Sequence, residues 1–172
     1  MSGTGRASTP NGGKKPAPAK PGAATKPGAK GEPAPEGDTP VGQTLTGTFV
    51  FTTIPTPGRY EGEYVNFPEK GIMRHGRGTY TEGGMTYTGT WKEDMMDGEG
   101  TITYGNGCSY QGQFKDNKYM GRGVYRWADG SQYEGDWVDG AMHGMGDYKD
   151  AAGSQWHGHF YNGSGPELVR PL

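Results

Sequence analysis

Three consecutive 23-residue units stand in register between residues 87 and 155: YTGTWKEDMMDGEGTITYGNGCS (87–109), YQGQFKDNKYMGRGVYRWADGSQ (110–132) and YEGDWVDGAMHGMGDYKDAAGSQ (133–155). Each unit opens with Tyr-x-Gly-x-aromatic and carries Gly-x-Gly eleven residues after its opening tyrosine. Trp156 begins a further half-unit. A fixed period in this range indicates a repeat array, in which each unit buries its apolar face against its neighbours.

The spacing within each unit predicts two short strands and two turns. Alternate residues of a strand share a face, so Tyr87, Gly89 and Trp91 lie on one side and the threonines between them on the other. A glycine on one strand then leaves space for a ring from the neighbouring strand. Turn sequences follow the predicted strands: Asn106-Gly107, Asp129-Gly130 and Asp139-Gly140. Between Glu69 and Gly165 there is no proline, which fits continuous strand pairing.

The flanking sequence divides the chain into three parts. Residues 1–42 hold eight of the 13 prolines and no aromatic residue, and we expect a disordered basic arm rich in Pro, Ala and Lys. Residues 43–165 form the array, and residues 166–172 are a tail that either covers the last strand or docks elsewhere. Within the array we expect a degenerate half-repeat (43–59), an irregular repeat (60–86), regular repeats (87–109, 110–132, 133–155) and a half-repeat (156–165). The irregular repeat has a longer first turn, residues 66–74, and longer turns of repeat proteins often mark binding.

Composition limits the class of protein. The 172 residues include 34 glycines and only 30% hydrophobic residues, so a conventional two-layer core is not expected. The single cysteine, Cys108, cannot form an intrachain disulfide, and a cytoplasmic, reducing location is the default. No apolar run approaches the about 20 residues of a membrane span.

The net charge of −2 is unevenly distributed. The arm is basic, with a net charge of +3, so residues 43–172 carry −5. That acidic array argues against nucleic acid as a partner and makes membrane binding by the repeats unlikely on charge grounds. The arm has the sign to meet an acidic surface such as a microtubule; an inert linker and a targeting peptide are the alternatives.

The sequence contains no pattern that predicts catalysis, a cofactor or a metal site. The acidic residues Asp94, Asp97, Asp116 and Asp139 fall at turns or opposite the rings, where we expect a solvated face. His157 and His159 share a strand face, but no third ligand stands at a fixed spacing. The Gly-x-Gly pairs do not open helices, so they do not predict a phosphate-binding loop. We therefore expect a protein that is not an enzyme.

Units of this form, over about residues 60–160, resemble MORN repeats. The resemblance implies an all-β fold: a single-layer, twisted antiparallel β-meander with one hairpin per repeat. It also implies a structural or adaptor role, in which the sheet holds a helix or an extended peptide of a protein partner. Membership of a ciliary or flagellar axonemal complex is part of what the family implies. Membrane tethering through the basic arm and the repeats is the alternative.

Two sets of aromatic residues are expected to have different roles. The set expected to pack the array is Tyr87, Trp91, Tyr110, Phe114, Tyr133, Trp137, Trp156 and Phe160. The set expected to be freer to meet a protein partner, because it lies on the second strand of each unit, is Tyr104, Tyr125, Trp127 and Tyr148.

Overall fold

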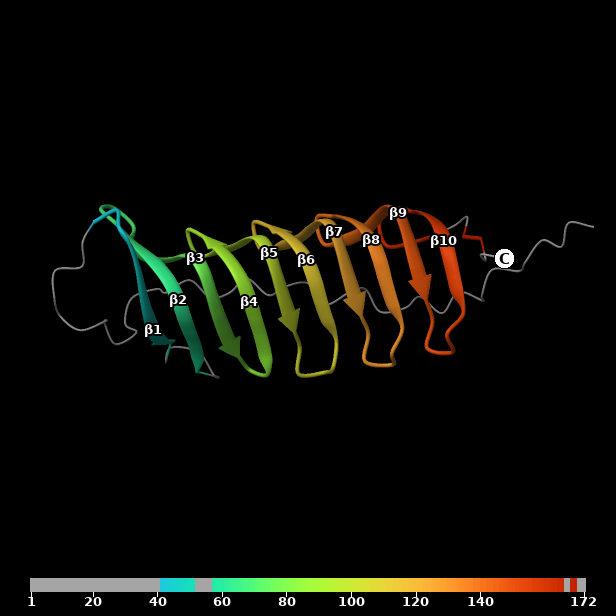
Figure 1. Cartoon of the computed structure of the whole chain (residues 1–172), viewed down its shortest axis with the longest axis horizontal. Coiled ribbons are helices and arrows are strands. Elements are labelled where there is room, and N and C mark those ends of the chain that lie inside the picture. The colour runs from blue at the N-terminus through green and yellow to red at the C-terminus, as the bar shows by residue number, and fades with distance from the viewer. Residues whose placement is uncertain (1–40, 52–56, 166–167, 170–172) are drawn as a thin grey trace, which may run out of the picture.

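The computed structural model describes residues 41–51, 57–165 and 168–169. Residues 1–40 of the predicted arm, and with them the question of its partner or targeting role, lie outside the described residues. Within these residues ten strands follow one another (Figure 1). They are β1 (Thr44–Phe51), β2 (Gly58–Phe67), β3 (Gly71–Glu82), β4 (Met85–Lys92), β5 (Met95–Thr103), β6 (Ser109–Lys115), β7 (Lys118–Arg126), β8 (Gln132–Val138), β9 (Ala141–Lys149) and β10 (Gln155–Phe160).

The ten strands form one sheet in the order of the sequence, and each is antiparallel to the next. The predicted single-layer, all-β meander is therefore confirmed. The even-numbered strands, here called opening strands, carry the aromatic-x-Gly-x-aromatic pattern. The odd-numbered strands, here called return strands, carry the second half of each unit. The sheet thus begins on a return strand, β1, and ends on an opening strand, β10.

One glycine of every strand lies in a single row across the sheet, which we call the glycine row. Each member pairs directly with the next. The row runs through Gly47, Gly62, Gly78, Gly89, Gly100, Gly112, Gly123, Gly135, Gly146 and Gly158. In β2, β4, β6 and β8 the pairing register shifts just after this glycine, as in a β-bulge, which bends a strand locally.

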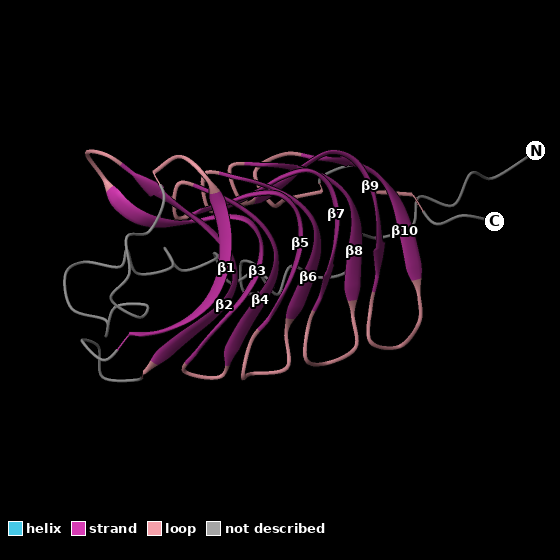
Figure 2. Ribbon diagram, turned by 60° about the vertical axis from the view of Figure 1, so that its left-hand side comes forward, coloured by secondary structure: helices cyan, strands magenta, loops and turns pink. Residues whose placement is uncertain are grey.

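The strands are strongly curved along their length, so the sheet forms a trough (Figure 2). Ring distances give the direction of the bend. Tyr87 and Trp91 are four residues apart on one strand, which places their Cα atoms about 13 Å apart when a strand is straight. Their ring centroids are only 5.0 Å apart, and the equivalent distance between Tyr110 and Phe114 is 5.2 Å. The rings therefore converge on the concave face, which is the interior of the trough.

Backbone turns explain how the opening and return strands connect. Two consecutive residues with positive φ join β4 to β5, β6 to β7 and β8 to β9, as at Asp116 (48°) and Asn117 (63°) or at Asp139 (50°) and Gly140 (82°). This is the two-residue turn that suits the twist of antiparallel strands, and Asn, Asp and Gly tolerate it best. Each turn also bonds back to the preceding unit, since the amide of Asn117 donates to the Met96 carbonyl at 3.1 Å.

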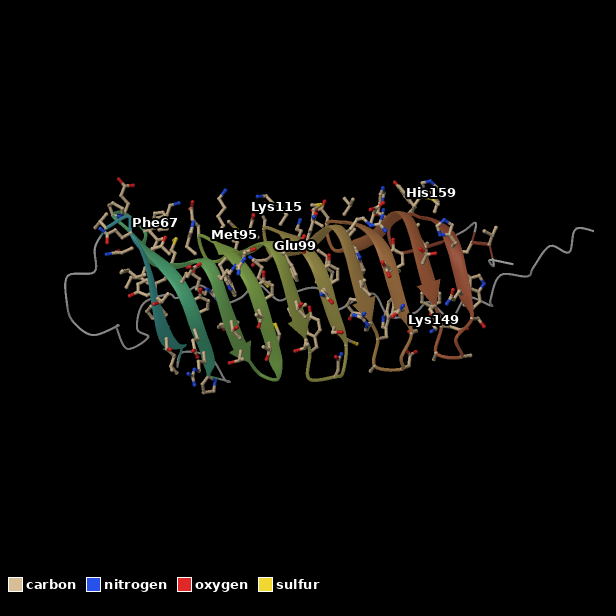
Figure 3. The ribbon with its side chains drawn as sticks, viewed as in Figure 1. Phe67, Met95, Glu99, Lys115, Lys149 and His159 are labelled. Atoms are coloured by element: carbon tan, nitrogen blue, oxygen red, sulfur yellow. The ribbon has the colours of Figure 1, made fainter. Side chains whose placement is uncertain are left out.

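The 66–74 segment is strand, whereas the sequence predicted a longer loop. Its residues lengthen β2 and β3 to 10 and 12 residues, and the turn between them is only Pro68–Lys70. The reason is that Asn66 and Phe67 still find antiparallel partners, Ile72 and Gly71. Proline sits at the turn, where its missing N–H breaks no ladder bond. The insertion is therefore a longer hairpin on one edge, at which Phe67 is visible in Figure 3.

Candidate functional site

The opening tyrosines close the interior of the trough. Tyr60, Tyr87, Tyr110 and Tyr133 are 0% exposed although the sheet has a single layer. Each ring lies over the glycine row, and its hydroxyl donates to a carbonyl three residues ahead, as from Tyr87 to Thr90 at 2.9 Å. Burial raises the pKa of all four phenols above the ordinary value of 10. These groups therefore stay neutral and structural at physiological pH.

The second aromatic of each opening strand connects one unit to the next. Phe114 contacts the Tyr110 ring of its own unit at 5.2 Å and the Tyr87 ring of the preceding unit at 5.0 Å, both edge-on. Trp137 repeats this arrangement with Tyr133 and Tyr110, at 5.3 Å each. Edge-to-face pairs contribute about 0.5–1.5 kcal/mol each beyond the burial of area. The array is thus held together by one continuous column of rings.

Of the eight residues expected to pack the array, seven are at most 5% exposed, and Trp156 is half-buried. The four residues expected to meet a partner differ from one another. Tyr125 is 1% exposed and Trp127 is 7% exposed, so both lie within the core. Tyr104 and Tyr148 are half-buried.

Solvent still reaches the half-buried rings of Tyr104, Tyr148 and Trp156 on the aromatic face, and we call these three the exposed rings. Tyr148 and Trp156 are adjacent, with centroids 5.9 Å apart, and Tyr148 also contacts the edge of Trp127 at 6.0 Å. The Tyr104 hydroxyl lies 2.5 Å from that of Tyr119, which comes from the opposite arm of the trough. Burial raises the pKa of Tyr104 to about 12. The exposed rings are therefore held in position by the core before any partner arrives.

Asp94 is not on a solvated face, as the sequence predicted, but forms a buried ion pair with Arg74. Their side chains are 4% and 2% exposed, and the Asp94 Oδ1 accepts bonds from the Arg74 amide and its Nε, both at 2.9 Å. The Arg74 guanidinium lies 4.2 Å from the centroid of the Trp91 ring. A turn position alone does not reveal this partner. The available signal was that Arg74 stands where the regular units have apolar residues, Met96, Tyr119 and Met142.

The convex face is polar. Over β2 to β5 it holds a shallow open groove of about 730 Å³, lined by Glu61, Gly62, Arg77, Gly78, Thr79, Thr88, Gly89, Thr90 and Glu99. The hydroxyls of Thr79 and Thr88 lie 3.1 Å apart across two strands. The lining mixes both signs of charge with neutral hydroxyls, so it has no marked preference for one class of ion.

Further charged side chains form surface pairs. Lys115 lies 2.7 Å from Asp97 and Lys118 lies 2.9 Å from Asp139, and both lysines are about half exposed. Such exposed pairs add little to stability, because water and salt screen the attraction between the two charges. Within the described ranges no three His, Cys, Asp or Glu side chains gather as metal ligands. Across that same part of the chain no helix has the length and apolarity of a membrane span.

Comparison with known proteins identifies the repeat. The family model for the MORN repeat matches residues 70–81, 87–109, 110–132 and 133–155, which are the last part of the irregular unit and the three regular units. Comparison with curated proteins finds no match. MORN repeats are scaffold repeats that bind proteins or membranes, and the family is not an enzyme family. Residues 70–81 and 87–155 of this chain are thus identified as MORN repeats.

Proposed function

We propose that this chain is a non-enzymatic adaptor whose sheet binds a helix or an extended peptide of a protein partner. The observation that carries the proposal is the set of exposed rings, Tyr104, Tyr148 and Trp156. Solvent-accessible aromatic residues held rigidly in place are the side chains that contribute most to protein interfaces, because they bury large areas with little loss of conformational freedom.

The charge of the array supports a partner of a particular kind. Residues 43–172 carry a net charge of −5, which attracts basic segments and repels anionic lipid. An amphipathic segment with apolar residues on one side and Lys or Arg on the other fits both the exposed rings and this charge. Membrane tethering would depend on the basic arm, so the experiment below includes it as an outcome that contradicts the proposal.

We further propose that the adaptor works in the cytoplasm, within a ciliary or flagellar axoneme. Family resemblance alone supports this location. The pattern over residues 110–169, including Tyr110-Gln-Gly-Gln-Phe and the closing Trp156-x-Gly-x-Phe, resembles the small MORN repeat-containing protein 2.

A pull-down with surface variants tests the adaptor role. The full chain is compared with Tyr148→Asp, which places a charge among the exposed rings. Its matched control is Thr88→Asp, which places the same charge on the exposed convex face two units away. We expect the control to retain the proteins enriched by the wild type and Tyr148→Asp to lose them, while circular dichroism of both variants stays native.

Two outcomes would contradict the proposal. The first is that Tyr148→Asp retains every protein that the wild type enriches. The second concerns vesicles that contain anionic lipid. If the full chain binds them, loses that binding when the six basic residues of the arm are replaced, and enriches no protein partner, the membrane alternative is favoured. Fluorescence of the half-buried Trp156 gives an independent readout, because a partner that covers this ring changes its emission.

A further inference from the structure

The two ends of the array are incomplete in complementary ways. A full unit has an opening strand followed by a return strand. Within the described residues, β1 is a return strand that follows no opening strand, and β10 is an opening strand that no return strand follows. Joined to each other, β10 of one copy and β1 of another would form one complete unit.

The glycine of β1 lacks the covering that its equivalents have. In each full unit, a Cβ on the return-strand glycine would lie within 2.6 Å of the opening tyrosine of the preceding strand, as between Gly123 and the Tyr110 hydroxyl at 2.3 Å. At Gly47 the nearest atom is Cε1 of Tyr64, on the following strand, at 3.0 Å. Among the described residues, no ring from a preceding strand lies over Gly47 as the opening tyrosine does in the full units.

No strand of the described residues pairs with the outer edge of β1, which we call its free edge. Its sequence, Thr44–Phe51, contains no charged residue and no proline. Edge strands of natural sheets normally carry such residues, because an unpaired strand of β-branched and aromatic residues is a template for another strand. Val50 is 44% exposed, and Phe49 packs only partly against the core.

The opposite end is protected by the tail. Val169 pairs with His157 on the outer edge of β10 through two main-chain bonds of 2.9 Å each, one in each direction. Leu168 packs against the hydrophobic core beside it. In a full unit, the residue before the row glycine of the opening strand pairs with the residue after the row glycine of the return strand, as Thr88 pairs with Thr101. His157 is the residue before Gly158, so Val169 occupies the place of that return-strand residue. On β1 that residue is Thr48.

We propose that β1 is a docking edge for β10 of a second copy of this chain, and that the pairing of Val169 with His157 is the contact that prevents it. When the tail leaves, Gly47 aligns with Gly158, Thr48 takes the place of Val169, and Phe49 lies opposite Trp156. This is the register of Gly89 with Gly100, Thr88 with Thr101 and Tyr87 with Ile102 inside a full unit. The contact is head-to-tail, so each added copy presents a further edge and assembly is not limited to a dimer.

Light scattering of the full chain and its variants tests this proposal. A release variant, Leu168→Ser with Val169→Pro, removes the core contact and the amide donor of the tail. Val169→Thr keeps that donor and the branched side chain, and is the matched control. We expect the wild type and the control to be monomers, and the release variant to reach a mean mass at least about twice that of the monomer, rising with concentration.

Blocking the other edge makes the test specific. Thr48→Pro removes a donor from the free edge of β1, and Thr46→Glu with Thr48→Glu blocks the edge by charge while leaving its backbone donors intact. Either change, added to the release variant, should return it to a monomer. A release variant blocked at β1 in this way, mixed with wild type, should form a one-to-one dimer and stop there. In this mixture the variant supplies the only free β10 edge and the wild type supplies the only free β1 edge, so assembly ends at the pair.

Three results would overturn the proposal. The first is a release variant that stays a monomer at every concentration. The second is assembly that neither β1 change prevents. The third is a blocked release variant that does not pair with the wild type when the two are mixed. Urea denaturation of each variant accompanies the measurement. A variant whose unfolding midpoint equals that of the wild type and that still gives one of these results counts against the docking edge.

Discussion

Gly123→Ala should destabilise the chain far more than an ordinary glycine-to-alanine change. Gly123 belongs to the glycine row, and its φ is not in the left-handed region, so its backbone conformation suits alanine. The new Cβ, however, would lie 2.3 Å from the Tyr110 hydroxyl and 2.5 Å from Cζ of that ring. Contacts this short do not occur, so the ring must move.

The surroundings of Tyr110 decide how much this movement costs. The ring is 0% exposed, stacks on Tyr119 at 3.9 Å, and meets Phe114 and Trp137 edge-on. Overpacking a filled core costs about 1–3 kcal/mol. Displacement also stretches the hydrogen bond from the Tyr110 hydroxyl to the Gln113 carbonyl, which contributes about 1 kcal/mol. We therefore expect the free energy of unfolding to fall by about 3 kcal/mol.

Urea denaturation followed by tryptophan fluorescence measures this change. The matched control is Gly105→Ala, where the nearest atom to a new Cβ lies at 3.5 Å and φ is not positive, so we expect a change within about 0.5 kcal/mol. In a Tyr110→Ala background the ring is absent, and adding Gly123→Ala should then cost no more than about 0.5 kcal/mol. The reasoning is refuted if Gly123→Ala costs the same in both backgrounds, or if it matches the control.

Three further predictions follow from the core. Asp94→Ala should lower the free energy of unfolding by about 3–5 kcal/mol, because it leaves the Arg74 charge buried. Arg74→Met with Asp94→Asn, which copies Met96 and Asn117 of the next unit, should be near neutral in the same urea measurement; equal losses from both variants would contradict this. The buried tyrosines have folded pKa values above 10, so their stabilising effect is present below pH 10 and is lost as the pH rises through the folded values. Absorbance of their tyrosinates should therefore appear together with loss of circular dichroism, and its appearance near pH 10 in a folded chain would contradict the burial. Cys108 is 9% exposed and should react with a thiol reagent much more slowly in buffer than in urea; equal rates would show that its turn opens freely.

The regular part of the fold was predictable because each local signal agreed with the next. The alternation of Tyr87, Gly89 and Trp91 assigned one face to rings, and the 23-residue spacing repeated that assignment in each unit. Asp139-Gly140 carries the residues that a two-residue hairpin turn requires. Strand order followed from short connections between successive strands, which leave adjacent pairing as the simplest arrangement.

What the sequence did not reveal depended on contacts between arms of the trough. Strand alternation places Tyr125 and Trp127 on the aromatic side, but it does not tell how sharply the strands bend, and the bend determines how much of each ring is covered. Tyr104 meets Tyr119 from the opposite arm, which no spacing within one unit indicates. The burial of Asp94 depended in the same way on Arg74, 20 residues earlier and in another unit.

The glycine row also has a mechanical consequence. A sheet without side chains along one line can bend about that line with little resistance, unless side chains on either side of the line limit the bend. The side chains that limit the bend are the opening tyrosines and the Phe or Trp that follows them. The size of these rings therefore determines the angle between the two halves of each strand. The Phe114 ring is smaller than those of Trp91 and Trp137 in the units on either side of it. Phe114→Trp should therefore widen the angle between the two halves of β6 and leave the other units unchanged. The direction of the array would then change at that unit.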